Sequence, residues 1–282
     1  MVSELNTLAR KIRADIVRMS HEGQAAHLGS SLSCVDLLVS AYWSSLRLGP
    51  HDWTDPARDR LILSKGHAAA AWYATLARRG YFPRSALATF NRPGSGLPEQ
   101  PCPRSMPGVE VATGSLGHGL PIGIGLALAA RIQSHSSRIV VIMSDGECNE
   151  GSVWEGAMFA AARQLGCLSI IVDYNRWQAT GRSQEIMALE PFAEKWRSFG
   201  WQTQEVNGHD VDLLQTIWNE QARSRARVGI PTAIIAHTIK GRGFSFMEDD
   251  NNWHYRIPNR EELARALAEL NIEIEPWDER HA

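Results

Sequence analysis

Long apolar runs, basic clusters and closely paired cysteines are all missing from this chain of 282 residues. No segment approaches the roughly 18 consecutive apolar residues that a membrane-spanning helix needs. The first residues, MVSELNTLARKIRADIVRM, mix charged and apolar side chains and lack the continuous apolar core of a signal peptide. Lys+Arg 29 nearly balances Asp+Glu 31, and no basic stripe is present. The sequence therefore argues against membrane insertion, secretion and nucleic-acid binding.

The cysteines are few and scattered. None of the four forms a CxxC pair: Cys34, Cys102, Cys148 and Cys167. Neither a zinc site nor a disulfide framework is indicated. Unpaired thiols are typical of a reducing compartment, so we expect a cytoplasmic protein.

Apolar and charged residues make up 44% and 21% of the chain, enough apolar material for a large core. Helix-period patterns alternate with short β-branched runs, which favours an α/β fold with a parallel, twisted sheet and helices on both faces. We expect one domain over residues 1–282. The expected strands are Arg60 to Leu63, Arg138 to Ser144, Leu168 to Asp173, Trp201 to Val206 and Pro231 to His237. The expected helices are Ser3 to Met19, Ser33 to Leu46, Gly66 to Arg79, Gly119 to Gln133, Val153 to Leu165, Pro191 to Phe199 and Val211 to Ala226.

Two of these strands end in residues that could bind a cation. The run IVVIM leads into Asp145 and Gly146, and the run LSIIVD leads into Asn175. Neighbouring parallel strands lie about 4.8 Å apart, so a carboxylate, an amide oxygen and the following backbone carbonyl, that of Trp177, could share one Mg²⁺. Gly146 would let a phosphate approach the backbone. The alternative is that Asp145 and Asn175 only serve turns.

The stretch SDGECNEGSVWEGAMFAAARQLGCLSIIVDYNR resembles the thiamine diphosphate signature, in which an Asp-Gly pair is followed one helix and one strand later by Asn. Three further segments, GSVWE, VATGSLG at 111–117 and KGRGFSFMEDDNNWH at 240–254, are similar to the transketolase family in particular. The likeness runs from Ala14 to about Pro258. It implies the thiamine diphosphate-binding fold, and thiamine diphosphate held with Mg²⁺, or with Ca²⁺ or Mn²⁺.

The resemblance also assigns the histidines. It places His67, in SKGH, and Lys240 at the cofactor diphosphate, His27 near the donor sugar, and His254 between diphosphate and substrate. Leu28 follows His27, at a position where the family usually has proline. Taken alone, a histidine at a helix start is more often a capping or core residue, and Lys240 could be a solvated lysine.

The segment Gly114, Ser115 and Leu116 matches the part of the family that contacts the aminopyrimidine ring. A dinucleotide-binding loop is the competing interpretation, but no strand precedes the segment and no acidic residue occurs at 133–140. Glu150 matches a glutamate at the subunit interface that links two active sites. Its alternative role is a charge that favours the start of a helix.

The resemblance covers only the N-terminal half of the family's chains. In the family, the glutamate that activates the aminopyrimidine lies on a following domain. The likeness therefore implies a C-terminal-section partner subunit that supplies this glutamate, in an α2β2 assembly, with a small sugar or sugar-phosphate substrate. The implied reaction transfers a two-carbon ketol unit from a ketose to an aldose. The alternatives are a decarboxylating and carboligating enzyme of 2-oxo acids and a non-catalytic assembly half.

Two positions depart from the family. The proline-rich stretch Asn91 to Gly108, which we expect to be a long functional loop, reads Glu99-Gln100-Pro101 where the family has Gly-His-Pro. Gln100 would replace a histidine at the donor's hydroxymethyl end, so we count it with the three histidines as a candidate catalytic residue. Glutamine cannot carry a proton at neutral pH. His118 stands where glutamine is usual, and both changes permit a non-standard ketose or 2-oxo-acid donor.

Overall fold

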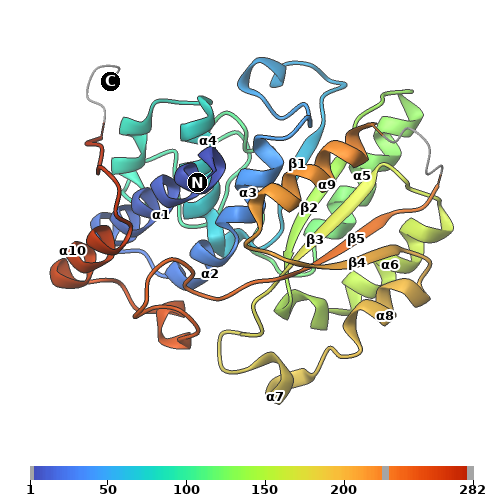
Figure 1. Ribbon diagram of the computed structural model, residues 1–282. Helices are drawn as coiled ribbons and strands as arrows, with labels where there is room; N and C mark the ends of the chain where they lie inside the picture. The colour runs from blue at the N-terminus through green and yellow to red at the C-terminus, as the bar shows by residue number, and fades with distance from the viewer. Residues whose placement is uncertain (1–2, 224–228, 278–282) are drawn as a thin grey trace.

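The computed structural model describes residues 3–223 and 229–277, which fold around one five-stranded parallel sheet (Figure 1). The strand order is β1-β2-β3-β5-β4, so the last strand of the chain lies between β3 and β4. The strands are β1 (Arg60–Leu63), β2 (Ile139–Ser144), β3 (Leu168–Tyr174), β4 (Gln202–Asn207) and β5 (Thr232–His237). All pair in parallel, which confirms the predicted fold class and the position of every predicted strand.

Helices cover both faces of the sheet because the central strands are apolar on both sides. Val140 and Ile142 of β2 belong to one buried cluster, while Val141 and Met143 belong to the other. The first cluster packs on α1 (Glu4–Gly23), α2 (Leu28–Ser33), α3 (Val35–Tyr42), α4 (Ala69–Arg79), α9 (Val211–Arg223) and α10 (Arg260–Glu269). The second packs on α5 (Gly119–Ile132), α6 (Gly151–Ala162) and α8 (Phe192–Ser198).

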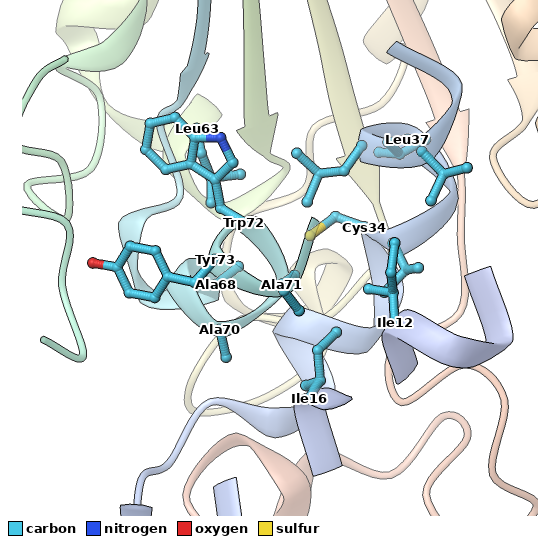
Figure 2. Close-up of a cluster of buried hydrophobic side chains, with 14 of the residues drawn as sticks. Ile12, Ile16, Cys34, Leu37, Leu63, Ala68, Ala70, Ala71, Trp72 and Tyr73 are labelled. Carbon is cyan, nitrogen blue, oxygen red and sulfur yellow. The ribbon is translucent and has the colours of Figure 1, made fainter. Parts of the chain in front are cut away.

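Part of the first cluster lies where the N-terminal helices meet (Figure 2). Ile12 and Ile16 of α1 lie close to Cys34 and to Ala71 of α4 (Figure 2), and all four side chains are buried. The indole N–H of Trp72 donates to the Tyr42 hydroxyl at 2.8 Å, so this large buried ring also has a polar partner. This packing holds α2 and the start of α4 beside the sheet edge that carries the site.

Several predicted helix boundaries differ from the structure. The helix expected over Ser33 to Leu46 is interrupted at Cys34, between α2 and α3, and it begins and ends earlier. The turn Gly66–Ala68 is a 3-10 helix that leads into α4. The expected residues 224–226 lie outside the described residues. Both α7 (Ser183–Met187) and α10 were missed.

The described residues contain no helix that is long and apolar enough to cross a membrane. All four cysteines are free thiols.

Candidate active site

The carboxyl ends of the strands bring the predicted polar residues to one edge of the sheet. Ser144 of β2 pairs in register with Asp173 of β3, so Asp145 and Asn175 leave adjacent strands at nearly the same level. Tyr174 pairs with His237 of β5, which places Lys240 just beyond the same edge. Parallel pairing thus converts residues far apart in sequence into neighbours.

Asp145 is a fully buried carboxylate at this edge, 0% exposed. One oxygen accepts from the Ser183 hydroxyl at 2.8 Å and the other from the backbone N–H of Gly146 at 3.0 Å. No ion pair to Asp145 is present among residues 3–223 and 229–277. Burial raises the pKa of Asp145 to about 7. A divalent cation would supply the positive charge that this carboxylate lacks.

Asn175 and Trp177 lie beside it, in the turn that follows β3. The side-chain oxygen of Asn175 accepts from the Trp177 backbone N–H at 3.0 Å, and Asn175 is buried. The predicted donor set is thus a carboxylate, an amide oxygen and a backbone carbonyl, all oxygen, which suits a hard cation such as Mg²⁺. Within the described chain, no group of three His, Cys, Asp or Glu side chains could hold a metal instead.

A buried ion pair, which sequence reasoning missed, lies at the carboxyl ends of these strands. The Lys65 ammonium bonds to the Asp173 carboxylate, and both side chains are wholly buried. The Ser33 hydroxyl donates to the same carboxylate at 2.6 Å, and the Thr238 hydroxyl also donates to it. Lys65 donates further to the Ser30 carbonyl at 2.9 Å. The network fixes the ends of β1, β3 and β5 to α2.

Three of the predicted site residues, His27, His67 and His254, lie close to one another. The ring centroids of His27 and His254 are 5.1 Å apart, those of His27 and His67 5.5 Å, and those of His67 and His254 5.9 Å. Burial, together with nearby positive charge, holds the pKa of His67 well below its usual range. Burial and the Lys240 ammonium lower the pKa of His254 to about 3. His67 and His254 are therefore neutral at physiological pH.

Lys240 connects the histidines to the loop after β5. Its ammonium donates to the Asn251 side-chain oxygen at 2.6 Å and to His254 Nδ1 at 3.1 Å. Burial lowers the pKa of Lys240 to about 8. It is a buried, bonded lysine and not the solvated one that the sequence left open.

The segment predicted to contact the aminopyrimidine crosses the turn that carries His67. A Cβ on Gly66 would lie 2.5 Å from the Thr113 carbonyl carbon, so only glycine permits this crossing. Gly114 has a φ of 126°, and a Cβ there would lie 2.3 Å from Gln100 Oε1. Gln100 thus packs against Gly114, in a loop without regular structure, as predicted for 91–108.

Other predicted residues lie at the margin of this group. Ser115 is exposed and Leu116 half-buried. Glu150 is exposed, and its Cβ would be 2.7 Å from a Cβ on Gly117, so it lies beside the crossing segment and not among the histidines. The ring of exposed His118 bonds to the Leu116 carbonyl at 3.1 Å.

Two contacts, which sequence reasoning missed, join the loops at this edge of the sheet. Arg182 donates to both oxygens of Asp249 at 2.7 Å, joining the loop after β3 to the loop after β5. The Trp177 indole donates to the same carboxylate at 2.8 Å. No short-range pattern marks this pair, because its members come from loops 67 positions apart.

The comparisons identify the family. The family model described as "Transketolase, thiamine diphosphate binding domain" matches residues 3–276. A 6-deoxy-6-sulfo-D-fructose transketolase subunit from Clostridium sp. is 42% identical over 247 residues, 88% of this chain and 89% of the relative. An apulose-4-phosphate transketolase subunit from Actinobacillus succinogenes is 40% identical over 272 residues, 96% of this chain and 97% of the relative.

Solved structures agree with this assignment. The transketolase of Leishmania mexicana superposes with a TM-score of 0.89 at 25% identity, covering 99% of this chain and 43% of that one. The transketolase of Campylobacter jejuni superposes with a TM-score of 0.88 at 25% identity, covering 98% of this chain and 44% of that one. The chain thus spans less than half the length of these solved transketolases. The predicted family and fold are confirmed, and the chain belongs to the transketolase family, in which it matches the thiamine diphosphate-binding domain.

Proposed function

We propose that this chain is the diphosphate-binding subunit of a split transketolase, a transferase that moves a two-carbon ketol unit from a ketose to an aldose. It uses thiamine diphosphate and Mg²⁺, or Ca²⁺ or Mn²⁺ in its place. The observation that carries the proposal is the buried carboxylate of Asp145, which has only neutral partners and lies beside Asn175. Such a carboxylate fits a cation that in turn holds a diphosphate.

Each polar group has a task in this proposal. Asp145, Asn175 and the Trp177 carbonyl hold the cation. The diphosphate would be bound by the Gly146 backbone, His67, His254 and Lys240. The aminopyrimidine would contact Gly114, Ser115 and Leu116. When bound, thiamine diphosphate supplies an electron sink for the carbanion of the ketol unit. His27 and Gln100 face the sugar.

The neutral histidines and the charged lysine give this candidate site a definite polarity. Because His67 and His254 remain unprotonated, they donate single N–H bonds without repelling Lys240. The Lys240 ammonium would then provide a second positive charge, besides the cation, for an anionic diphosphate.

We propose that the partner is a C-terminal-section subunit that supplies the activating glutamate in an α2β2 assembly. The relatives from Clostridium and Actinobacillus are named as subunits, and the chain covers nearly their whole length. Large apolar side chains are exposed on α6, the helix that Glu150 caps, and on α7, as a subunit contact requires: Met158, Phe159, Ile186 and Met187. We further propose that the chain is one domain, since a single sheet carries both cores, and that it acts in the cytoplasm, where free thiols persist.

The donor we propose is a ketose that carries an anionic group. The names of the two relatives specify a sulfonated ketose and a phosphorylated sugar. The assembled enzyme should therefore release an aldose when given ketose phosphates or sulfonates together with an acceptor. Turnover of pyruvate in the absence of any ketose turnover would contradict the proposal and favour the 2-oxo-acid alternative.

Gln100→His is expected to change donor choice. A histidine hydrogen bond to a substrate hydroxyl is worth about 0.5–1.5 kcal/mol, or up to about 3 if the imidazole is charged. The kcat/KM for ordinary phosphorylated ketoses such as xylulose 5-phosphate should rise between a few-fold and about a hundredfold relative to other donors, with cofactor affinity nearly unchanged. The measurement is the ratio of kcat/KM for two donors. An unchanged ratio would mean that Gln100 only supports Gly114.

Cofactor affinity is expected to fall as pH rises above about 8. The pKa of Lys240 is lowered to about 8, and only its charged form pairs with diphosphate, so binding weakens once the lysine loses its proton. The dissociation constant should increase by up to about tenfold between pH 8 and 9. Lys240→Arg keeps its charge and should remove this loss of cofactor affinity at high pH, as measured by calorimetric titration of the complex. The same pH dependence in both proteins would rule out Lys240 as its source.

A further inference from the structure

Glu99 lies against the predicted donor histidine, although it belongs to the irregular proline-rich loop. One of its carboxylate oxygens accepts from the Ala26 backbone N–H at 3.1 Å and lies 3.1 Å from His27 Nδ1. The two side chains are 33% and 20% exposed, so the contact is partly open to solvent and within reach of a small molecule.

The backbone of His27 also has a hydrogen-bond partner. Its N–H donates to the His254 carbonyl at 2.8 Å, and its φ of 64° is in the left-handed region. A non-glycine residue adopts this conformation only where surrounding contacts require it. His27 is thus held through its ring by Glu99 and through its backbone by the His254 carbonyl.

These partners fix which nitrogen of each ring carries the hydrogen. A carboxylate only accepts hydrogen bonds, so neutral His27 must carry its hydrogen on Nδ1 and leave Nε2 as an acceptor. An ammonium only donates, so His254 accepts from Lys240 at Nδ1 and carries its hydrogen on Nε2. Two rings that meet edge to face at 5.1 Å therefore present one base and one N–H donor.

We propose that Glu99 is a positioning residue that holds His27 in the Nδ1–H tautomer, so that Nε2 takes the hydroxyl proton of the bound donor sugar. This inference rests on the proposed ketol transfer. When the ketol unit leaves, the remaining carbon becomes an aldehyde, so its hydroxyl O–H bond must break. The proton moves to His27 Nε2, the oxygen's electron pair forms the C=O bond, and the electron pair of the broken C–C bond stays with the ketol unit, for which the cofactor is the sink. The carboxylate of Glu99 then stabilises the imidazolium.

The role proposed for Glu99 coincides with the departure of this loop from the family sequence. The family has glycine where this chain has Glu99, and histidine where it has Gln100. Gln100 packs on Gly114 and cannot carry a proton. This chain has therefore lost one titratable group in the loop and gained a carboxylate that bonds to His27, another histidine of the candidate site.

The tautomer can be measured on the full chain without any substrate. With ¹⁵N-labelled histidine, the two ring nitrogens of His27, assigned by comparison with His27→Asn, should give the signature of Nδ1–H and bare Nε2. In Glu99→Leu this signature should shift towards Nε2–H, whereas Glu261→Gln, at an exposed glutamate on α10, should change nothing. An unchanged His27 spectrum in Glu99→Leu would overturn the proposal.

Kinetics of the assembled enzyme provide the second arm. Glu99→Gln keeps an acceptor but loses the charge, so kcat should fall about tenfold, while Glu99→Leu should lower it about a hundredfold. The KM for the donor and the affinity for thiamine diphosphate should stay within about twofold of wild type. Equal losses in the two variants, or a loss confined to KM, would contradict a tautomer role. No turnover by wild type would overturn the proposed function instead, since the nitrogen spectrum tests Glu99 independently of catalysis.

Discussion

Asp145→Ala is expected to abolish binding of Mg²⁺ and thiamine diphosphate, weakening it at least a hundredfold. The substitution removes the one anionic oxygen donor that we assign to the cation, so the diphosphate would enter the pocket with its cation under-coordinated. Breaking a buried charge pair costs about 3–5 kcal/mol, which corresponds to more than a hundredfold in affinity. Asn175→Ala removes a neutral ligand and should weaken binding about tenfold. Calorimetric titration of the assembled complex measures both.

Folding provides the control for this variant. Because the pKa of Asp145 is raised from 3.8 to about 7, ionising the buried carboxylate disfavours the folded chain without cation, and that penalty grows as pH rises from 3.8 to about 7 and is constant above. Asp145→Ala should therefore leave the melting temperature of the cofactor-free chain unchanged or higher at pH 8. The gain in melting temperature on adding cofactor and Mg²⁺ should vanish. Unchanged affinity in Asp145→Ala would refute the metal assignment.

The purified chain alone should show no ketol transfer at any concentration of thiamine diphosphate. The carboxylate that we assign to activation of the aminopyrimidine belongs to the proposed partner subunit, and without it the bound cofactor would not supply its electron-sink chemistry. Adding the purified partner should produce turnover that saturates at one partner chain per chain. A coupled assay of aldose release measures both conditions.

The matched control replaces the activating glutamate of the partner by glutamine. This mixed complex should assemble and bind cofactor but turn over as poorly as the chain alone. Ketol transfer by the rigorously purified single chain would disprove the split arrangement.

The predictions that succeeded depend on regular structure. Parallel strands joined by a helix place their carboxyl ends together, so Asp145 and Asn175 could be paired from the runs IVVIM and LSIIVD alone. The site roles of both residues remain proposals. The missed helix α10 had a sequence signal: Asn259 and Glu262 form a capping box just before an amphipathic run.

The contacts that were missed depend on tertiary placement. Lys65 follows β1 and Asp173 lies one residue before the end of β3. These strands are separated in the sheet by β2, so pairing the two residues requires the strand order. Glu99 reaches His27 because the proline-rich loop folds back on the end of α1, where the Asn91 amide donates to the Gly23 carbonyl at 3.0 Å. No periodicity encodes the path of such a loop.

The most direct test of the central claim is a crystal structure of the chain with its partner, grown with thiamine diphosphate and Mn²⁺, with anomalous scattering used to locate the metal. We predict one anomalous peak at the carboxyl edge of β2 and β3, coordinated by Asp145, by Asn175 and by the Trp177 carbonyl, with the diphosphate on its open side. An ordered cofactor whose Mn²⁺ lies elsewhere, with Asp145 still bonded only to Ser183 and Gly146, would contradict the account.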